Sequence, residues 1–216
     1  MMILRHLWAQ PVTCSPFPAI PTPQARKAFA RRCLDSGAIG ILFPNVQSGP
    51  EAVDLVKNCY YPAAAGVSGT RGFGYGGCNA DGAEFAAYAA AANSRIVVGV
   101  QLENTRAFAE DTLREILAVD GLRFTQDGPY DHSGSHLVPG ATADARVVAE
   151  LARYRAMAQT AGIPAGKHVV QPTPQNIAEA VEAGYSFIAL GTDMQHVQQG
   201  CARAMAVVAA AAEAAP

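Results

Sequence analysis

Apolar residues follow two alternating patterns along the chain. Short, nearly continuous apolar runs such as Ala38–Phe43 and Arg95–Glu103 are typical of strands buried on both faces of a parallel sheet. Longer stretches between these runs repeat their apolar residues with a helical period. The predicted strands are 11–14, 38–43, 95–103, 121–124, 167–170 and 186–190, and the predicted helices are 23–36, 50–60, 81–92, 105–119, 143–161, 174–183 and a long helix at the C-terminus.

This alternation predicts βαβ units and therefore an α/β fold with a parallel sheet. No linker or composition break divides the pattern, so residues 1–216 are predicted to form a single domain. A (β/α)8 barrel has eight strands and typically about 250 residues. We therefore expect a TIM-like barrel that is shortened at its N-terminus to about six recognisable strands. An incomplete barrel has an open sheet edge, which we expect residues 1–10 or another chain to cover.

Composition and charge exclude several kinds of partner. The net charge is −2 and the basic residues are scattered, whereas a nucleic-acid-binding protein needs a basic stripe. No apolar run approaches the roughly 18 residues that cross a bilayer, and no signal-peptide cleavage site follows the first residues. The five cysteines include no Cys-x-x-Cys pair, which fits a reducing compartment. We therefore expect a cytoplasmic protein that binds neither nucleic acid nor membrane.

The glycine-rich stretch "GTRGFGYGG" (69–77) formally matches a dinucleotide-binding motif. That motif needs a preceding strand and a following apolar helix, and this stretch has neither. We interpret it as a loop over the strand ends. Arg71 in this loop is a candidate substrate-binding residue, because arginine binds anionic groups well at a pocket mouth.

The segment "TQDGPYDHSGSH" (125–136) gathers proton-exchanging side chains directly after a short apolar run. His132 and His136 are four residues apart, a spacing that could bind zinc if the segment were helical. Gly134 and its neighbouring serines do not favour a helix. We therefore interpret both histidines as loop or surface residues rather than metal ligands.

Two carboxylates are stronger candidates for chemistry. Glu103 ends one predicted strand, and Asp131 follows the end of the next one. The C-terminal ends of neighbouring barrel strands converge at one mouth, and Gln101 shares the inward face of its strand with Glu103. Converging carboxylates repel unless they are protonated or bridged by a cation such as Mg²⁺ or Mn²⁺. The alternative is that Asp131 caps a helix while Glu103 pairs with an arginine, and the residues alone leave both possibilities open.

Several collinear segments resemble one known family. The most specific are "PNVQ" (44–47), the "Q-x-E" strand end (101–103) and "GPYD-x-S" (128–133), with further support from "ANSRIVVGVQLENTRAF", "AGIPAGKH" and "YSFIALGTDMQHV". From about Pro11 to the C-terminus the chain resembles the HpcH/HpaI aldolases, the metal-dependent class II pyruvate aldolases, which also resemble macrophomate synthase. The resemblance implies a (β/α)8 barrel that assembles into a homo-oligomer, a hexamer or a dimer, with exchanged C-terminal helices.

The resemblance also implies a chemistry. Glu103 and Asp131 would hold a divalent metal, Mg²⁺ or Mn²⁺ with Co²⁺ as a further candidate, and the metal would chelate a 2-oxo acid and stabilise its enolate. Gln101 would lie near the keto acid. The loop formed by Gly128, Pro129 and Tyr130 would receive the substrate carboxylate through backbone N–H groups.

The chain departs from the family pattern at two places. It contains no Glu-His-Gly motif, whose histidine assists proton transfer, and Cys14 stands where the family has an arginine that polarises the keto oxygen. The family's "D-L-S" reads "D-H-S" here, so His132 lies beside the predicted metal loop. We take His132 as a candidate catalytic base on the ground of this adjacency.

Three hypotheses of function follow. The first is a carbon–carbon lyase that cleaves a 4-hydroxy-2-oxo acid to pyruvate and an aldehyde, or catalyses the reverse addition. The second is a degenerate homologue that binds metal and keto acid with poor turnover. The third is a non-catalytic assembly partner. The retained residues Gln101, Glu103 and Asp131 favour metal binding, whereas Cys14 and the missing motif argue against ordinary catalysis.

Overall fold

The structure, a computed structural model, describes residues 12–14, 23–73 and 82–213. Its strands are β1 (Val12–Cys14), β2 (Gly40–Phe43), β3 (Val97–Leu102), β4 (Leu122–Asp127), β5 (Ala165–Val169) and β6 (Phe187–Leu190). Its helices are α1 (Pro23–Asp35), α2 (Gly49–Lys57), α3 (Gly82–Arg95), α4 (Glu110–Leu117), α5 (Pro129–Ser135), α6 (Ala145–Ala161), α7 (Pro174–Glu182) and α8 (Asp193–Glu213).

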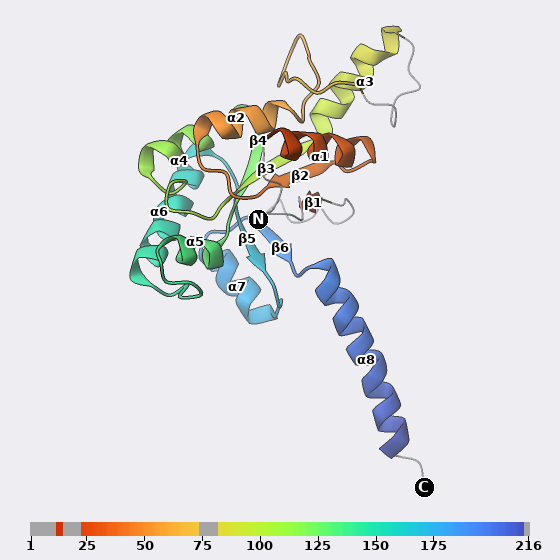
Figure 1. Ribbon diagram of the computed structural model, residues 1–216, viewed down its shortest axis with the longest axis vertical. Coiled ribbons are helices and arrows are strands. Elements are labelled where there is room, and N and C mark those ends of the chain that lie inside the picture. The colour runs from red at the N-terminus through yellow and green to blue at the C-terminus, as the bar shows by residue number, and fades with distance from the viewer. Residues whose placement is uncertain (1–11, 15–22, 74–81, 214–216) are drawn as a thin grey trace.

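The strands form one parallel sheet in which the spatial order equals the chain order, β1 to β6. When each right-handed crossover moves in the same direction, the helices collect on one face and the sheet curls as a barrel does. Figure 1 shows α2, α4, α6 and α7 following one another around the strands. The predicted α/β class and parallel sheet are confirmed, and the curled arrangement is consistent with part of a TIM-like barrel.

The register of β3 and β4 places a set of side chains on the inner face of the curled sheet. Gly99 pairs with Phe124 and Gln101 pairs with Gln126, so these four residues share the inner face of the curl. Phe124 stacks on Phe187 of β6 with ring centroids 4.1 Å apart. A Cβ atom at Gly99 would lie 2.3 Å from the Phe124 ring, so the ring needs a glycine beside it. The aromatic pair therefore fills the curl beneath Gln101 and Gln126.

Local sequence signals explain why several predicted helices agree with the structure. Ser48 caps α2 by accepting a hydrogen bond from the Glu51 backbone N–H. Thr173 and Asn176 form a reciprocal capping box at the start of α7. Gly162 ends α6 in the left-handed conformation, with φ of 70°. Each signal fixes one helix end without help from tertiary packing.

The segment after β4 differs from the prediction. β4 continues to Asp127, because its polar residues pair with β3 as far as Leu102, and the polar stretch is therefore strand rather than loop. Pro129 to Ser135 form helix α5. Proline at the first helical position has the φ angle that a helix needs, and burial of His132 and Ser133 outweighs the low helix propensity of Gly134.

Helix α8 projects away from the rest of the chain (Figure 1). Its large exposed apolar residues are Met194, Val197, Met205, Val207 and Val208. None of the described helices is long and apolar enough to span a membrane. Residues 1–10, which we predicted as one possible cover of the sheet edge, lie outside the described residues.

Candidate active site

The candidate site begins at the end of β3. Glu103 follows the strand directly and is 8% exposed. Gln101 donates a hydrogen bond from Nε2 to Glu103 Oε2, over 2.7 Å. The backbone N–H of Asn45, which follows β2, also donates to the Glu103 carboxylate. Two neighbouring strand ends thus hold one carboxylate in a fixed position.

Asp131 lies in the first turn of α5, immediately after β4, and its carboxyl group is close enough to share a hydrogen bond with Glu103 when one of the two is protonated. Burial is the main cause that raises the pKa of Glu103, and the neighbouring charge of Asp131 raises it further, to about 7. Glu103 is buried, whereas Asp131 is exposed. The structure therefore brings the two predicted metal-ligating carboxylates together at the C-terminal ends of the strands, with one side open to solvent.

Gly128 makes this approach possible. A Cβ atom here would lie 2.7 Å from Glu103 Cβ and 2.8 Å from Gln101 Nε2, distances too short for any side chain. The Gly128 backbone N–H donates to Leu102 of β3, and its carbonyl accepts from His132 of α5. The glycine therefore joins the end of β3 to the start of α5 while leaving the carboxylates room to meet.

A divalent cation fits the chemistry of this pair. Two carboxylates in contact, one with a raised pKa, form the arrangement that a bridging cation stabilises. Carboxylate oxygens are the ligands that Mg²⁺ and Mn²⁺ prefer. Gln126, on the same inner face as Gln101, is 4% exposed, and its Oε1 atom is buried without a hydrogen-bond partner among the described residues. The site therefore offers oxygen donors to a hard cation.

Two residues of this site were missed at the level of sequence. The prediction of a loop at Gln126 is wrong, because this residue lies in β4, and its alternation with Phe124 is the signal that identifies the inner face. Asn45 lies in the "PNVQ" segment that carries the resemblance, and it adopts a positive φ of 52°. Such a backbone is uncommon outside glycine, and here it accompanies the Asn45 N–H that reaches Glu103.

Two other predicted substrate-binding residues, at the start of α5, line a separate hollow. Pro129 and Tyr130 line a hollow of about 710 Å³ together with Asp127, Lys167 and Tyr185. The Tyr130 side chain is 67% exposed, and its carbonyl accepts a hydrogen bond from Ser133 Oγ. Neither Glu103 nor Asp131 is among the residues that line this hollow.

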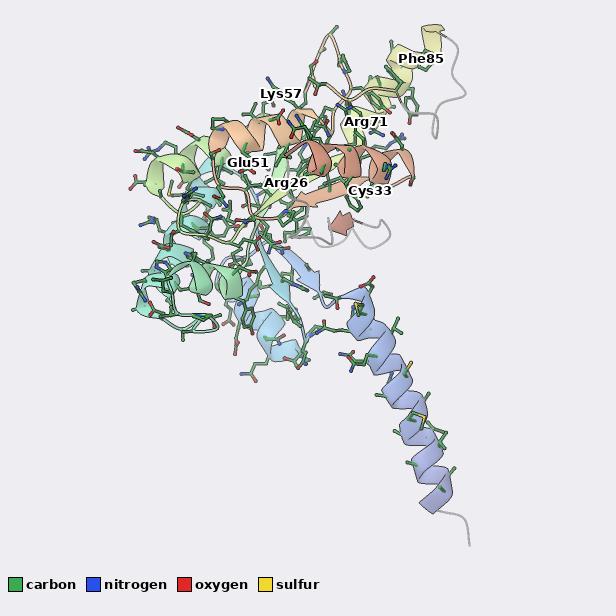
Figure 2. The ribbon with its side chains drawn as sticks, in the orientation of Figure 1. Arg26, Cys33, Glu51, Lys57, Arg71 and Phe85 are labelled. Atoms are coloured by element: carbon green, nitrogen blue, oxygen red, sulfur yellow. The ribbon has the colours of Figure 1, made fainter. Side chains whose placement is uncertain are left out.

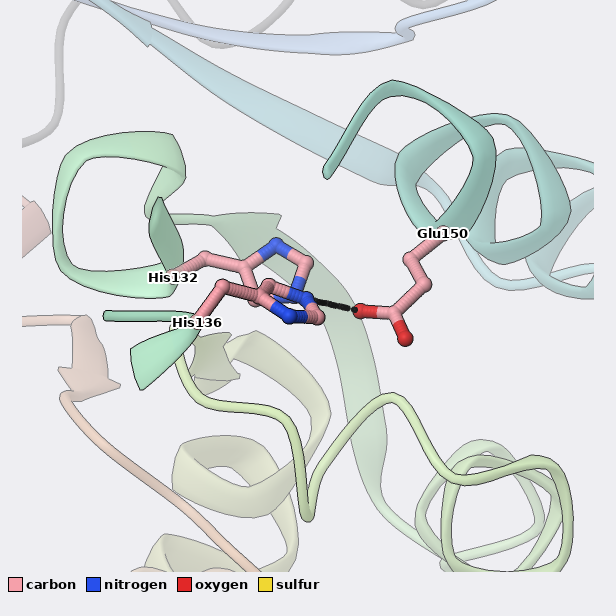
Figure 3. Close-up of side chains that lie close together, drawn as sticks. All are labelled: His132, His136 and Glu150. Carbon is pink, nitrogen blue, oxygen red and sulfur yellow. Dashed lines mark hydrogen bonds and ion pairs between the residues drawn. The ribbon is translucent and has the colours of Figure 1, made fainter. Parts of the chain in front are cut away.

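His132 does not face that pair. Its ring is fully buried, stacks on Phe108 with centroids 4.0 Å apart, and bonds through Nε2 to Glu150 of α6 (Figure 3). Burial lowers the pKa of His132. Because these contacts hold the ring between α5 and α6, adjacency to Asp131 in sequence does not bring it to the site, and the geometry gives no support to His132 as the base.

Arg71 lies at the other end of the sheet. It is 4% exposed, pairs with Asp35 over 2.7 Å and lies over the Tyr61 ring at 4.4 Å. Asp35 ends α1, and the helices of such a fold run opposite to the strands, so this pair lies away from the strand ends that carry Glu103. Figure 2 shows Arg71 above α1. The prediction of Arg71 at a pocket mouth disagrees with this position.

Comparison with known proteins shows which family and relatives the sequence resembles. The family described as HpcH/HpaI aldolase/citrate lyase matches residues 4–200. A hydroxypyruvate/pyruvate aldolase of Paraburkholderia phytofirmans is 31% identical over 189 residues, covering 87% of this chain and 71% of the relative. A 4-hydroxy-2-oxovalerate aldolase of Novosphingobium aromaticivorans is 28% identical, covering 88% of this chain and 68% of the relative.

Solved structures show the same fold. An HpcH/HpaI aldolase/citrate lyase family protein of Burkholderia cenocepacia superposes with a TM-score of 0.70 at 25% identity, covering 84% of this chain and 69% of the other. Macrophomate synthase superposes with a TM-score of 0.67 at 22% identity, covering 87% and 64%. The match over most of the chain, together with the shared architecture, shows that this chain belongs to the HpcH/HpaI aldolase/citrate lyase family.

Proposed function

We propose that the protein is a divalent-metal-dependent carbon–carbon lyase acting on a 2-oxo acid. It would cleave a 4-hydroxy-2-oxo acid to pyruvate and an aldehyde, or catalyse the reverse addition. The observation that carries the proposal is the contact between Glu103 and Asp131, which are separated in sequence and meet at the strand ends. The names of the relatives, which are pyruvate and 2-oxo-acid aldolases, support the same reaction class.

Glu103 and Asp131 would hold the metal, Mg²⁺ or Mn²⁺ with Co²⁺ as a further candidate. When bound there, the metal would act as a Lewis acid toward the oxygens of the keto acid. Gln101 keeps the Glu103 carboxylate oriented through its 2.7 Å hydrogen bond. The amide oxygen of Gln126, which has no hydrogen-bond partner among the described residues, lies on the same inner face, and we assign it to contact with the substrate.

The first turn of α5 would receive the substrate carboxylate. N–H groups in a first helical turn have no carbonyl partner within the helix, and they attract anions. Tyr130 and Asp131 supply these groups, and Pro129 fixes the turn. Cleavage breaks the C3–C4 bond, leaves its electron pair on C3, and requires a base to take the proton of the 4-hydroxyl group. We do not assign this base to His132, because its Nε2 is committed to Glu150.

A second candidate is a degenerate homologue that binds metal and keto acid with poor turnover. The observation that favours it is the position of the His132 ring, since this was the residue proposed to replace the family histidine. Cys14, at the position of the family arginine, favours it as well, because a thiol cannot polarise a keto oxygen as a guanidinium does.

Coupled detection of pyruvate tests the proposal. Cleavage of a 4-hydroxy-2-oxo acid is measured with and without Mn²⁺, in the natural chain, in Glu103→Ala and in the control Glu182→Ala, which changes an exposed residue of α7. We expect release that depends on Mn²⁺ and is lost only in Glu103→Ala. Binding of Mn²⁺ without pyruvate release would support the degenerate homologue, and failure of both would support the assembly partner.

We also propose that the chain forms a homo-oligomer through α8 and that its location is cytoplasmic. Met194, Val197, Cys201, Met205 and Val208 recur at intervals of three and four residues, which places them on one helical face. These side chains are exposed in the single chain. An apolar stripe of this kind is stabilised when a second copy covers it.

A further inference from the structure

Three side chains outside the candidate active site converge between α5 and α6. His132 and His136 both direct Nε2 at one carboxylate oxygen of Glu150, over 2.6 Å and 2.9 Å (Figure 3). The potential ligand atoms of all three residues lie within 4.8 Å of one another. Two imidazoles and a carboxylate at this proximity have the donor atoms and the spacing to hold a metal ion.

Helix α5 produces this convergence. Residues four apart lie on the same side of a helix, so His132 and the helix-ending His136 face α6 together. Phe108 stacks on the His132 ring at an interplanar angle of 16° and fixes its direction. The sequence-based argument against a zinc pair rested on the expectation of a loop, and the structure removes that ground.

We propose that His132, His136 and Glu150 bind a Zn²⁺ ion that ties α5 to α6. Imidazole nitrogen and carboxylate oxygen are ordinary zinc ligands, and a fourth position can be taken by water. His136 is 12% exposed and Glu150 is 23% exposed, so solvent reaches one side of the cluster while the His132 side is closed. This site is distinct from the Glu103–Asp131 pair, which offers only carboxylate oxygens and should prefer Mg²⁺ or Mn²⁺.

Zinc binding would move the proton of each imidazole from Nε2 to Nδ1. Without zinc, each Nε2–H donates to Glu150 Oε2, and in the zinc-bound form each ring carries its proton on Nδ1 instead. The Nδ1 atom of His132 is buried without a hydrogen-bond partner in the described part of the chain. Because outer hydrogen bonds strengthen histidine ligands, we expect weaker binding than at a fully supported zinc site.

Zinc titration of the full chain tests the proposal. The double variant Glu103→Gln/Asp131→Asn removes the oxygen site, so that binding can be assigned without measuring activity. Isothermal titration calorimetry should show one equivalent of Zn²⁺ and no Mg²⁺ in this background. Adding Glu150→Gln or His136→Ala removes a ligand and should weaken Zn²⁺ binding by more than the roughly 10- to 100-fold that loss of an outer hydrogen bond costs, whereas the controls Glu182→Gln and His196→Ala should leave it unchanged.

A spectroscopic readout keeps the test valid if a variant fails to fold. Co²⁺ bound to the natural chain in saturating Mg²⁺ should give the visible absorption of a tetrahedral site, and Zn²⁺ should displace it. Failure of Zn²⁺ to bind, or equal binding in Glu150→Gln and His136→Ala, would overturn the proposal and leave a hydrogen-bonded cluster that joins two helices. Either result is independent of the proposed lyase activity.

Discussion

Gln101 donates a 2.7 Å hydrogen bond to Glu103, two residues further along the same strand end. Because this contact orients a buried carboxylate, Gln101→Leu should weaken Mn²⁺ binding at the Glu103–Asp131 pair. The loss of such an outer hydrogen bond costs about 10- to 100-fold in metal affinity. Mn²⁺ titration followed by electron paramagnetic resonance measures the change, and Gln175→Leu on α7 is the control. Equal affinity in both variants would show that Gln101 does not support the ligand.

Gly128→Ala should damage the same site by steric contact. The new methyl group would lie 2.7 Å from Glu103 Cβ, so the carboxylate must move. Overpacking of this kind costs about 1–3 kcal/mol, and we expect Mn²⁺ binding to weaken by about tenfold or more. Gly134→Ala is a matched control, because a Cβ there meets nothing within 4 Å. Calorimetry measures the Mn²⁺ affinity of both variants. Unchanged binding in Gly128→Ala would contradict the described packing.

The carboxyl group of Asp127 should make the free energy of unfolding depend on pH. It is 1% exposed and bonded to the Tyr185 hydroxyl, and burial raises its pKa to about 6. The folded chain therefore binds a proton on the Asp127 carboxyl group more tightly than the unfolded chain does. The stabilisation from this protonated carboxyl group is full below about pH 4 and is lost as pH rises through about 6. Relative to Asp127→Asn, the free energy of unfolding of the natural chain should fall by about 2–3 kcal/mol between pH 4 and pH 8.

Urea unfolding across this pH range measures the difference. Asp144→Asn serves as the control, because hydrogen bonds from Arg146 lower the pKa of Asp144 to about 2. Its contribution is present above pH 4 and is lost only as pH falls through about 2, so this variant should show little change over the same range. A stability difference for Asp127→Asn that stays constant from pH 4 to pH 8 would refute the expected titration.

The apolar stripe of α8 should control assembly. Val197→Glu/Met205→Glu places two charges on the stripe, and it should shift the chain toward the monomer in size-exclusion chromatography with light scattering. Gln199→Glu/Ala206→Glu adds the same charge on the opposite face of α8 and should leave the assembly unchanged. If both variants have the same size as the natural chain, α8 is not the interface.

Much of the fold could be predicted from the sequence. Continuous apolar runs predicted strands such as β2 and β3, and the helical period of apolar residues predicted helices such as α2 and α7. These signals are short-range, so they survive without tertiary information. The end of β4 was missed, because Thr125, Gln126 and Asp127 are polar and become strand only by pairing with β3.

The candidate site was predictable where strand alternation decides it. Gln101 and Glu103 share a face by simple periodicity, and Asp131 follows the neighbouring strand end. The direction of the His132 ring was not predictable, because it depends on the helix α5 and on Glu150, which is distant in sequence. Arg71 was misplaced for a similar reason, since its partner Asp35 belongs to a different βα unit.

The position of a bound ion tests the central claim most directly. Crystals of the full chain grown with Mn²⁺ and pyruvate can be measured near the manganese absorption edge, where anomalous scattering locates the metal. We predict one strong peak at about 2 Å from a carboxylate oxygen of Glu103 and from one of Asp131, a usual distance for a hard divalent ion. A map without this peak, or carboxylates turned away from each other around water, would contradict the proposed metal centre and the lyase activity that depends on it.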